Sequence, residues 1–178
     1  DWSWTLLSPV EQAAMAQLSV FRGGCQLDSA EAVLRLDEFD EDAWVMDVVE
    51  SLVDQSLLRR VEPHAGHVRY RMLESIRQYA AEKLGEETDR IARHHAEHFS
   101  SLGAWEQLRA LNTHGGVERR ADLTPELENL RAGFDTSLDT GEAEVAALCA
   151  IAASELYLMN GPFSDGISLL DRLAEVEQ

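Results

Sequence analysis

Apolar residues recur at three- and four-residue spacing in three stretches of the first third of the chain, and this period predicts three successive helices. The first begins after Ser8, because Ser8 and Glu11 have the spacing of a capping box. The second opens at Asp28 by the same capping pattern, and the third follows the acidic connector 37–42. The expected inward residues are Val10, Ala14, Leu18 and Phe21 in the first helix and Trp44, Val45, Val48, Val49 and Leu52 in the third.

Between residues 57 and 72 the apolar period changes from helical to alternating. Two strands joined by a turn at 63–66 are therefore expected. The second strand places Val68, Tyr70 and Met72 on one face and Arg69 and Arg71 on the other. A further helix then carries Leu73, Ile76, Ala80 and Leu84 inward. Three helices followed by a two-stranded wing define the winged variant of helix-turn-helix, which we expect over residues 1–84.

The pattern after residue 84 is helical to the end of the chain. Residues 85–121 are expected to form a connecting long helix and a polar loop at 112–121. The apolar stripe of that helix comprises Ile91, His95, His98, Leu102 and Trp105. Residues 122–178 are expected to form stacked antiparallel helical hairpins, the start of an α-solenoid. In the last helix the expected inward residues are Phe163, Ile167, Leu170 and Ala174. The predicted fold class is mainly α with one small β-hairpin.

The charge of the chain argues against nucleic-acid binding. It has 33 acidic and 15 basic residues, a formal net charge of -18, whereas most non-specific affinity for DNA comes from neutralising phosphates with Lys and Arg. The third helix would expose Asp47, Glu50, Ser51, Asp54 and Gln55. We therefore expect no direct DNA binding by this segment. A DNA-binding transcription factor that uses the winged helix directly is the first alternative.

The three histidines His94, His95 and His98 suggest a metal site, because the first and last lie one helical turn apart. A metal-dependent hydrolase built on them is the second alternative. The order of the residues is not HExxH and no third ligand stands at a motif spacing, so packed, hydrogen-bonded histidines are favoured. We expect no metal, no catalytic residue and no enzymatic activity.

The remaining composition indicates a cytoplasmic protein without a membrane anchor. Cys25 and Cys149 are isolated and are expected to be reduced core thiols. No apolar run approaches the roughly 20 residues that span a bilayer, and no signal peptide is present. The chain begins at Asp1 instead of a methionine, so we expect it to be a piece of a longer protein.

Several segments resemble the winged-helix part of bacterial STAND-type signalling NTPases, the large LuxR-like and AfsR-like transcriptional regulators related to NB-ARC proteins. They are DWSW (1–4), LSPVEQAAMAQLSVFRGGCQLDSAEAV (7–33), SLVDQSLLRR (51–60) and RYRMLESIRQYAAEKL (69–84), of which the last is the most specific. Residues 123–146 and 161–176 are similar to the first tetratricopeptide-like helices that follow in that family. The resemblance covers nearly the whole chain.

The resemblance implies a non-catalytic regulatory fragment. In the family a P-loop nucleotide-binding domain precedes the winged helix, which acts as an intramolecular latch and helps to hold the ADP-bound, inactive state. This chain has no GxxxxGK[ST] motif, so ADP or ATP is expected in the full-length protein and not in this fragment. The helices would begin an array that binds an effector or protein.

The family's best-known nucleotide contact is altered in this chain. A Met-His-Asp triplet of plant and animal relatives contacts ADP through its histidine, and the matching residues here are Met72, Leu73 and Glu74. Leucine has no hydrogen-bond donor in its side chain. The remaining candidates for a nucleotide contact are Arg69, Arg71 and Arg77. The candidates for contact with another domain are Arg59, Arg60, Met72 and Glu74.

Overall fold

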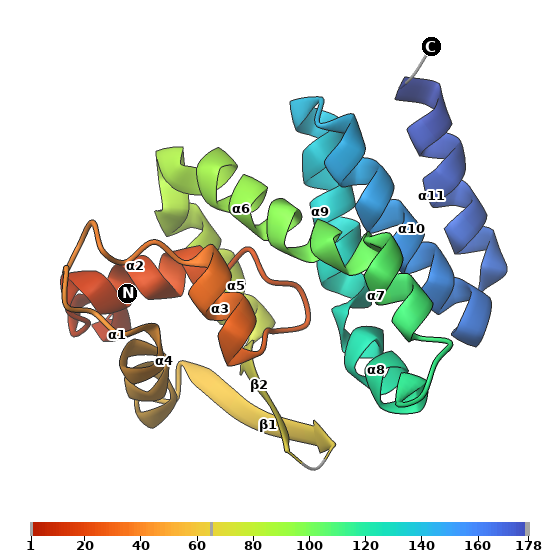
Figure 1. The fold of residues 1–178 in the computed structure, drawn as a ribbon. Helices are drawn as coiled ribbons and strands as arrows, with labels where there is room; N and C mark the ends of the chain where they lie inside the picture. Colours follow the sequence, from red (N-terminus) through yellow and green to blue (C-terminus); the bar gives the residue numbers. More distant parts are fainter. Residues whose placement is uncertain (1, 65, 177–178) are drawn as a thin grey trace. The chain divides into compact units, whose positions relative to one another are not determined.

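The computed structural model describes residues 2–64 and 66–176 and confirms the predicted fold class (Figure 1). The described residues are mainly helical, with one antiparallel two-stranded sheet. They divide into two compact units, 1–91 and 92–178, with the boundary inside one helix. The first unit contains α1 (Trp2–Thr5), α2 (Pro9–Leu18), α3 (Leu27–Val33), α4 (Val45–Asp54), β1 (Leu58–His64), β2 (His67–Met72), α5 (Glu74–Leu84), η1 (Gly85–Glu87) and the start of α6 (Thr88–Ser100).

The capping box predicted at the start of α2 is present. The Ser8 backbone N–H donates to Glu11 Oε2 at 2.7 Å, and the Glu11 N–H donates to Ser8 Oγ at 3.4 Å. The other carboxylate oxygen of Glu11 accepts from Ser51 Oγ at 2.5 Å and Gln55 Nε2 at 2.8 Å. Glu11 therefore caps α2 and also ties its first turn to the last turn of α4.

Three helix details predicted from the apolar period are wrong. α3 begins at Leu27 and its N-cap, Gln26, makes no side-chain capping bond, so Asp28 lies inside the first turn. Trp44 is the N-cap of α4 and is 75% exposed, because the helix starts after it and turns only Val48, Val49 and Leu52 into the core. Leu73 likewise is the N-cap of α5, in extended conformation, and is 41% exposed.

The two strands of the wing form as the alternating pattern predicts, but β1 continues through Pro63 and His64, which were predicted to lie in the turn. Leu58 pairs with Met72, Arg59 with Arg71, Arg60 with Tyr70 and Val61 with Arg69, and the register shifts between Val61 and His64. Tyr70 also forms an isolated bridge with Cys25, in which Cys25 N–H donates to Tyr70 O at 3.0 Å and Tyr70 N–H to Cys25 O at 2.8 Å. β2 therefore has hydrogen-bonded neighbours on both sides.

The loop before Cys25 requires glycine. Gly24 has φ +88°, and a Cβ at this position would lie 2.4 Å from the carbonyl oxygen of Tyr70. A side chain would clash with the strand backbone and strain the loop. Gly24 thus allows the loop after α2 to approach the backbone of β2 closely.

The second unit is entirely helical in its described residues. Its elements are the rest of α6, η2 (Ser101–Gly103), α7 (Trp105–Ala110), α8 (Gly116–Leu123), η3 (Thr124–Glu126), α9 (Leu127–Thr140), α10 (Ala143–Asn160) and α11 (Phe163–Val176). α9, α10 and α11 lie side by side and are joined by short turns (Figure 1). Gly133 permits close packing, since a Cβ there would lie 3.1 Å from Cys149 Sγ and 3.3 Å from Ala96 Cα.

Two expectations for the connecting segment are wrong. The long helix predicted through Trp105 ends at Ser100, and Trp105 is exposed. The backbone of η2 packs directly against α10 at this point, because a Cβ on Gly103 would lie 2.0 Å from Leu148 O. Residues 116–121 of the predicted loop belong to α8, whose Arg119 donates to the carbonyl oxygens of Ala110 and His114.

The predicted inward face of α11 is also wrong. Phe163 is 61% and Ile167 60% exposed, whereas Leu169 is buried. Gly166 faces the ring of Tyr157, where a Cβ would lie 3.2 Å from Tyr157 Cβ. The small residue brings this side of α11 against α10 and turns the larger apolar stripe away from it.

α10 is, within the described residues, the one helix long and apolar enough to cross a membrane by length and composition. It approaches the spanning length that we expected no apolar run to reach. Its buried residues are Ala146, Cys149, Ala150, Ala152, Ala153, Leu156 and Tyr157. The core helix of a folded domain passes the same test, but only 39% of this span is buried, and Ile151, Leu158 and Met159 are exposed.

Candidate functional site at the base of the wing

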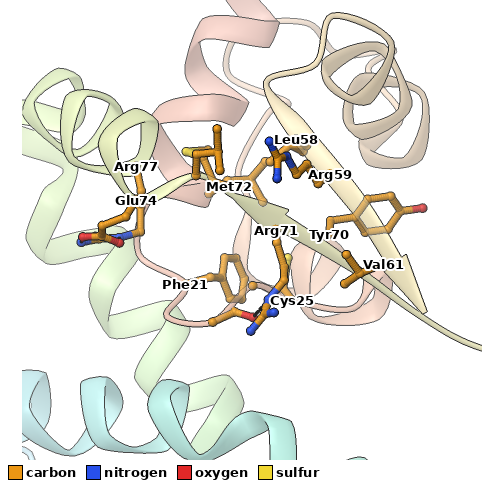
Figure 2. Close-up of a pocket in the computed structure, with 14 residues that line it drawn as sticks. Phe21, Cys25, Leu58, Arg59, Val61, Tyr70, Arg71, Met72, Glu74 and Arg77 are labelled. Atoms are coloured by element: carbon orange, nitrogen blue, oxygen red, sulfur yellow. Dashed lines mark hydrogen bonds and ion pairs between the residues drawn. The ribbon is translucent and has the colours of Figure 1, made fainter. Parts of the chain in front are cut away.

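A pocket with a volume of about 370 Å³ opens where the loop after α2, the two wing strands and the start of α5 meet (Figure 2). Its apolar lining comprises Leu18, Phe21, Cys25, Leu58, Val61, Tyr70, Met72 and Leu73. Its charged lining residues are Arg59, Arg71, Glu74 and Arg77. We call this feature the wing pocket. Ligand sites combine such an apolar surface with a few polar groups.

Two arginines stand opposite each other on the wing strands. Arg59 of β1 is directly paired with Arg71 of β2, and directly opposed residues in a sheet place their side chains on the same face. Arg71 Nε donates to the carbonyl oxygen of Gly23 at 2.9 Å. Arg59 is exposed, and its side chain forms no hydrogen bond or ion pair within the described part of the chain. Figure 2 shows Arg71 between Phe21 and Val61, reaching toward the loop that carries Cys25.

Glu74 and Arg77 form an ion pair at another edge of the wing pocket (Figure 2). Arg77 Nε and Nη2 donate to the two Glu74 carboxylate oxygens at 2.8 and 2.6 Å, and Gln78 Nε2 donates to Glu74 Oε1 at 3.0 Å. The hydrogen bonds from Arg77, followed by that from Gln78, lower the pKa of Glu74 to about 2. The same ion pair raises the pKa of Arg77. The carboxylate of Glu74 is thus already occupied by its own helix.

The wing pocket brings together most of the residues selected from the sequence. Arg59, Met72 and Glu74, three of the four interdomain candidates, line it with the nucleotide candidates Arg71 and Arg77 and with Leu73. Arg60 is exposed but is not part of the lining. Arg69 is 2% exposed, and its Nη2 donates to Gly24 O at 2.9 Å, so it supports the loop from within.

Sequence reasoning missed the opposite wall of the wing pocket. Phe21, Gly23, Gly24 and Cys25 were interpreted only as a core residue, a helix stop and a core thiol, yet all of them line the pocket. The double glycine was the available signal, because a glycine pair between a helix and a strand often marks a close backbone approach.

The exposed face of α4 is acidic, as predicted. Asp47, Glu50 and Asp54 are exposed and the helix contains no lysine or arginine. Trp44 and Met46 are exposed beside them. In a winged helix this third helix is the element that usually enters the DNA major groove. Its surface here offers carboxylates and apolar groups.

His95 and His98 make different contacts. His95 is buried and its Nε2 lies 3.2 Å from Asn129 Oδ1, while Asn129 Nδ2 donates to Glu126 Oε2 at 2.8 Å. The ring of His98 stands edge-on to Phe99. In the described ranges no group of three or more His, Cys, Asp or Glu residues could hold a metal ion.

Comparison with known proteins identifies the class of the first unit. Residues 7–85 match the family model described as a winged helix-turn-helix domain. This range includes α2 to α5 and the whole wing, so the fold and the family model agree. No solved structure matches the chain.

The chain is similar to parts of longer mycobacterial proteins, some of which are named as transcriptional regulators. The chain is 34% identical over 177 residues to "Putative HTH-type transcriptional regulator Rv0890c" of Mycobacterium tuberculosis and to "Putative HTH-type transcriptional regulator Mb0914c" of Mycobacterium bovis, over 98% of this chain and 20% of each relative. It is 41% identical over 100 residues to "Uncharacterized protein Rv0894" of Mycobacterium tuberculosis, over 55% of this chain and 25% of the relative. The chain is homologous to these proteins and spans about a fifth to a quarter of their length.

Proposed function

We propose that the chain is a non-catalytic regulatory segment of a transcriptional regulator, whose winged helix docks onto another domain through the wing pocket. The observation that carries this proposal is the distribution of charge on the first unit. The helix that would read DNA is acidic, whereas Arg59, Arg71 and Arg77 gather around an apolar pocket. The segment itself has no enzymatic activity and no cofactor in this proposal.

Direct DNA reading by α4 is disfavoured by its charge. Carboxylates on Asp47, Glu50 and Asp54 would be repelled by phosphates within a Debye length of about 8 Å at physiological salt. The helix also lacks the arginines that contact guanine in the major groove. The relatives' names and the wing arginines favour the rival function, a DNA-binding transcription factor.

A gel shift on random duplex DNA at low salt separates the two functions. No shift is expected for this chain, because its formal charge is -18. A salt-dependent shift that disappears in Arg59→Glu and Arg71→Glu would instead support DNA binding through the wing, and would overturn the proposal.

The docking partner that fits the resemblance is a P-loop nucleotide-binding domain elsewhere in the longer protein. The wing pocket, at the position of the family's ADP-contacting triplet, would act as an intramolecular latch on that domain. Leu73 lies at the pocket but has no side-chain donor, so the latch would not depend on a nucleotide contact through this residue. Binding of an effector or partner to helices α9 to α11, as the start of a tetratricopeptide-like array in the cytoplasm, would shift the population toward the released state.

Nucleotide measurements test the latch. Calorimetric titration of this chain with ADP and ATP should show no binding. In the longest natural protein that contains the segment, Arg71→Glu should accelerate release of bound nucleotide, while Arg60→Glu, outside the pocket, should not. Micromolar affinity of this chain for ADP, or identical exchange in both variants, would overturn the latch.

A further inference from the structure

From the charge and shape of the wing pocket we infer that its occupant is an acidic protein segment, which inserts one bulky apolar side chain into the pocket and places carboxylates on Arg59 and Arg71. This inference rests on the proposed docking function and adds the chemistry of the partner. It uses the cross-strand arginines and the apolar wall of the loop after α2, and requires no nucleotide.

The first support is the uncompensated arginine pair. Like charges that stand directly opposite each other on a sheet are destabilising, and Arg59 and Arg71 are such a pair. Glu74, the one acidic residue in the pocket lining, is held by Arg77 and Gln78 of its own helix. An external carboxylate would therefore meet these two arginines without competition from a free carboxylate of the pocket lining.

The second support is the apolar wall beneath the arginines. Phe21, Cys25 and Leu58 are buried residues of the core that reach the pocket surface. A volume of about 370 Å³ accommodates a large apolar side chain and lies near the lower end of the range for ligand pockets, about 300–1,000 Å³. A cationic rim over an apolar wall matches an anchor residue flanked by acids.

The loop chemistry favours a carboxylate-bearing segment over a polyphosphate. Phosphate sites typically present clustered backbone N–H groups of a glycine-rich loop or a helix N-terminus. Here Gly23 and Gly24 direct their carbonyl oxygens at Arg71 and Arg69, and the N–H of Cys25 is bonded to Tyr70. The donors left at the pocket are arginine side chains, which recognise planar carboxylates well.

Fluorescence anisotropy with a labelled synthetic peptide tests the inference on this chain. The probe has one phenylalanine flanked on both sides by aspartates and glutamates. One control peptide replaces the phenylalanine with alanine, and another replaces the acids with their amides. The acidic phenylalanine peptide should bind, and each control peptide should bind at least about tenfold more weakly. Equal binding of either control peptide would overturn the inference.

Matched variants locate the site. Arg59→Glu should weaken peptide binding at least about tenfold, the loss expected for a charge-assisted hydrogen bond. Arg60→Glu makes the same charge change on the next residue of β1, outside the pocket lining, and should weaken binding by less than about threefold. Equal losses of peptide binding in Arg59→Glu and Arg60→Glu would mean that the peptide is held by general electrostatic attraction, and would overturn the inference. Displacement of the peptide by ADP at lower concentration than by the unlabelled peptide would instead assign the site to phosphate.

The exchange assay distinguishes this inference from the docking function. If Arg71→Glu accelerates nucleotide release in the longer protein but no acidic peptide binds this chain, the wing still docks and the acidic segment is wrong. If neither effect is observed, both fail. Circular dichroism of each variant verifies that the winged helix remains folded.

Discussion

The paired arginines of the wing give a prediction with an unusual sign: Arg59→Glu should stabilise the chain. The substitution replaces a like-charge pair with an opposite-charge pair at directly opposed positions, Arg59 and Arg71. Cross-strand pairs of this kind are worth roughly 0.2–1 kcal/mol each, favourable or unfavourable by sign. Removing the repulsion and adding the attraction should together contribute about 1 kcal/mol, with solvent screening at this exposed position keeping the value low.

Urea denaturation measures this change, with Arg60→Glu as the control. Arg60 is opposed by Tyr70, so its substitution relieves no repulsion and only adds negative charge to a chain of formal charge -18. The stabilisation by Arg59→Glu should be reduced at about 1 M salt, where the Debye length is about 3 Å. If Arg59→Glu destabilises as much as Arg60→Glu does, the guanidinium groups do not repel each other and the argument from register is refuted.

Three further substitutions test the packing on which the wing pocket and the hairpins depend. Glu11→Gln should cost about 0.5–2 kcal/mol near neutral pH. Hydrogen bonds, above all the one from Ser51, lower the pKa of Glu11 in the folded state. The stability that the Glu11 carboxylate contributes is therefore present above the unfolded pKa and is lost as the pH falls through the folded pKa. The urea midpoints of the wild-type protein and Glu11→Gln should converge in acid. Gly24→Ala should cost about 1–3 kcal/mol in thermal unfolding, and Gly66→Ala less, because both glycines have positive φ but only Gly24 faces a strand backbone. Leu169→Ala should cost about 2–5 kcal/mol and its neighbour Leu170→Ala under about 0.5, whereas a larger cost for Leu170→Ala than for Leu169→Ala would mean that α11 faces α10 as the sequence period suggested.

Local chemistry explains why much of the first unit could be predicted from the sequence. The capping box at Ser8 and Glu11 forms within four residues, so it depends on no distant partner. The alternation from 58 to 72 places successive side chains on opposite faces in any strand, and the observed pairing of Leu58 with Met72 follows it. Such signals need only backbone geometry, which is why they were confirmed.

The failures occur where a second segment decides which apolar face is buried. In α11 two stripes compete, and the sequence period favours the larger one with Phe163 and Ile167. The close approach of Gly166 to Tyr157 selects the other side. Leu73 continues the apolar period of α5, yet its extended backbone at the N-cap leaves it exposed at the wing pocket. A period identifies candidate faces but contains no information about the neighbouring element.

The wing pocket combines both cases. Arg59 and Arg71 could be read from the sequence as basic residues on a wing, but their pairing depends on a register that shifts between Val61 and His64. The apolar wall opposite them comes from the loop that Gly24 brings against β2. The site exists only because a local hairpin and a distant loop meet, so neither pattern alone could predict it.

The size of the proposed contact is suited to a reversible latch. Two charge-assisted hydrogen bonds, one each on Arg59 and Arg71, would contribute about 1.5–3 kcal/mol apiece, or about 3–6 kcal/mol before screening. Moving a two-state equilibrium from 1:99 to 99:1 takes about 5.5 kcal/mol. A docked wing held by this contact would therefore remain closed at rest, since tethering in one chain supplies a high effective concentration. An effector that binds the released state more tightly than the docked state by a similar free energy could open the latch. A large obligate interface would be too stable for such an effector to open.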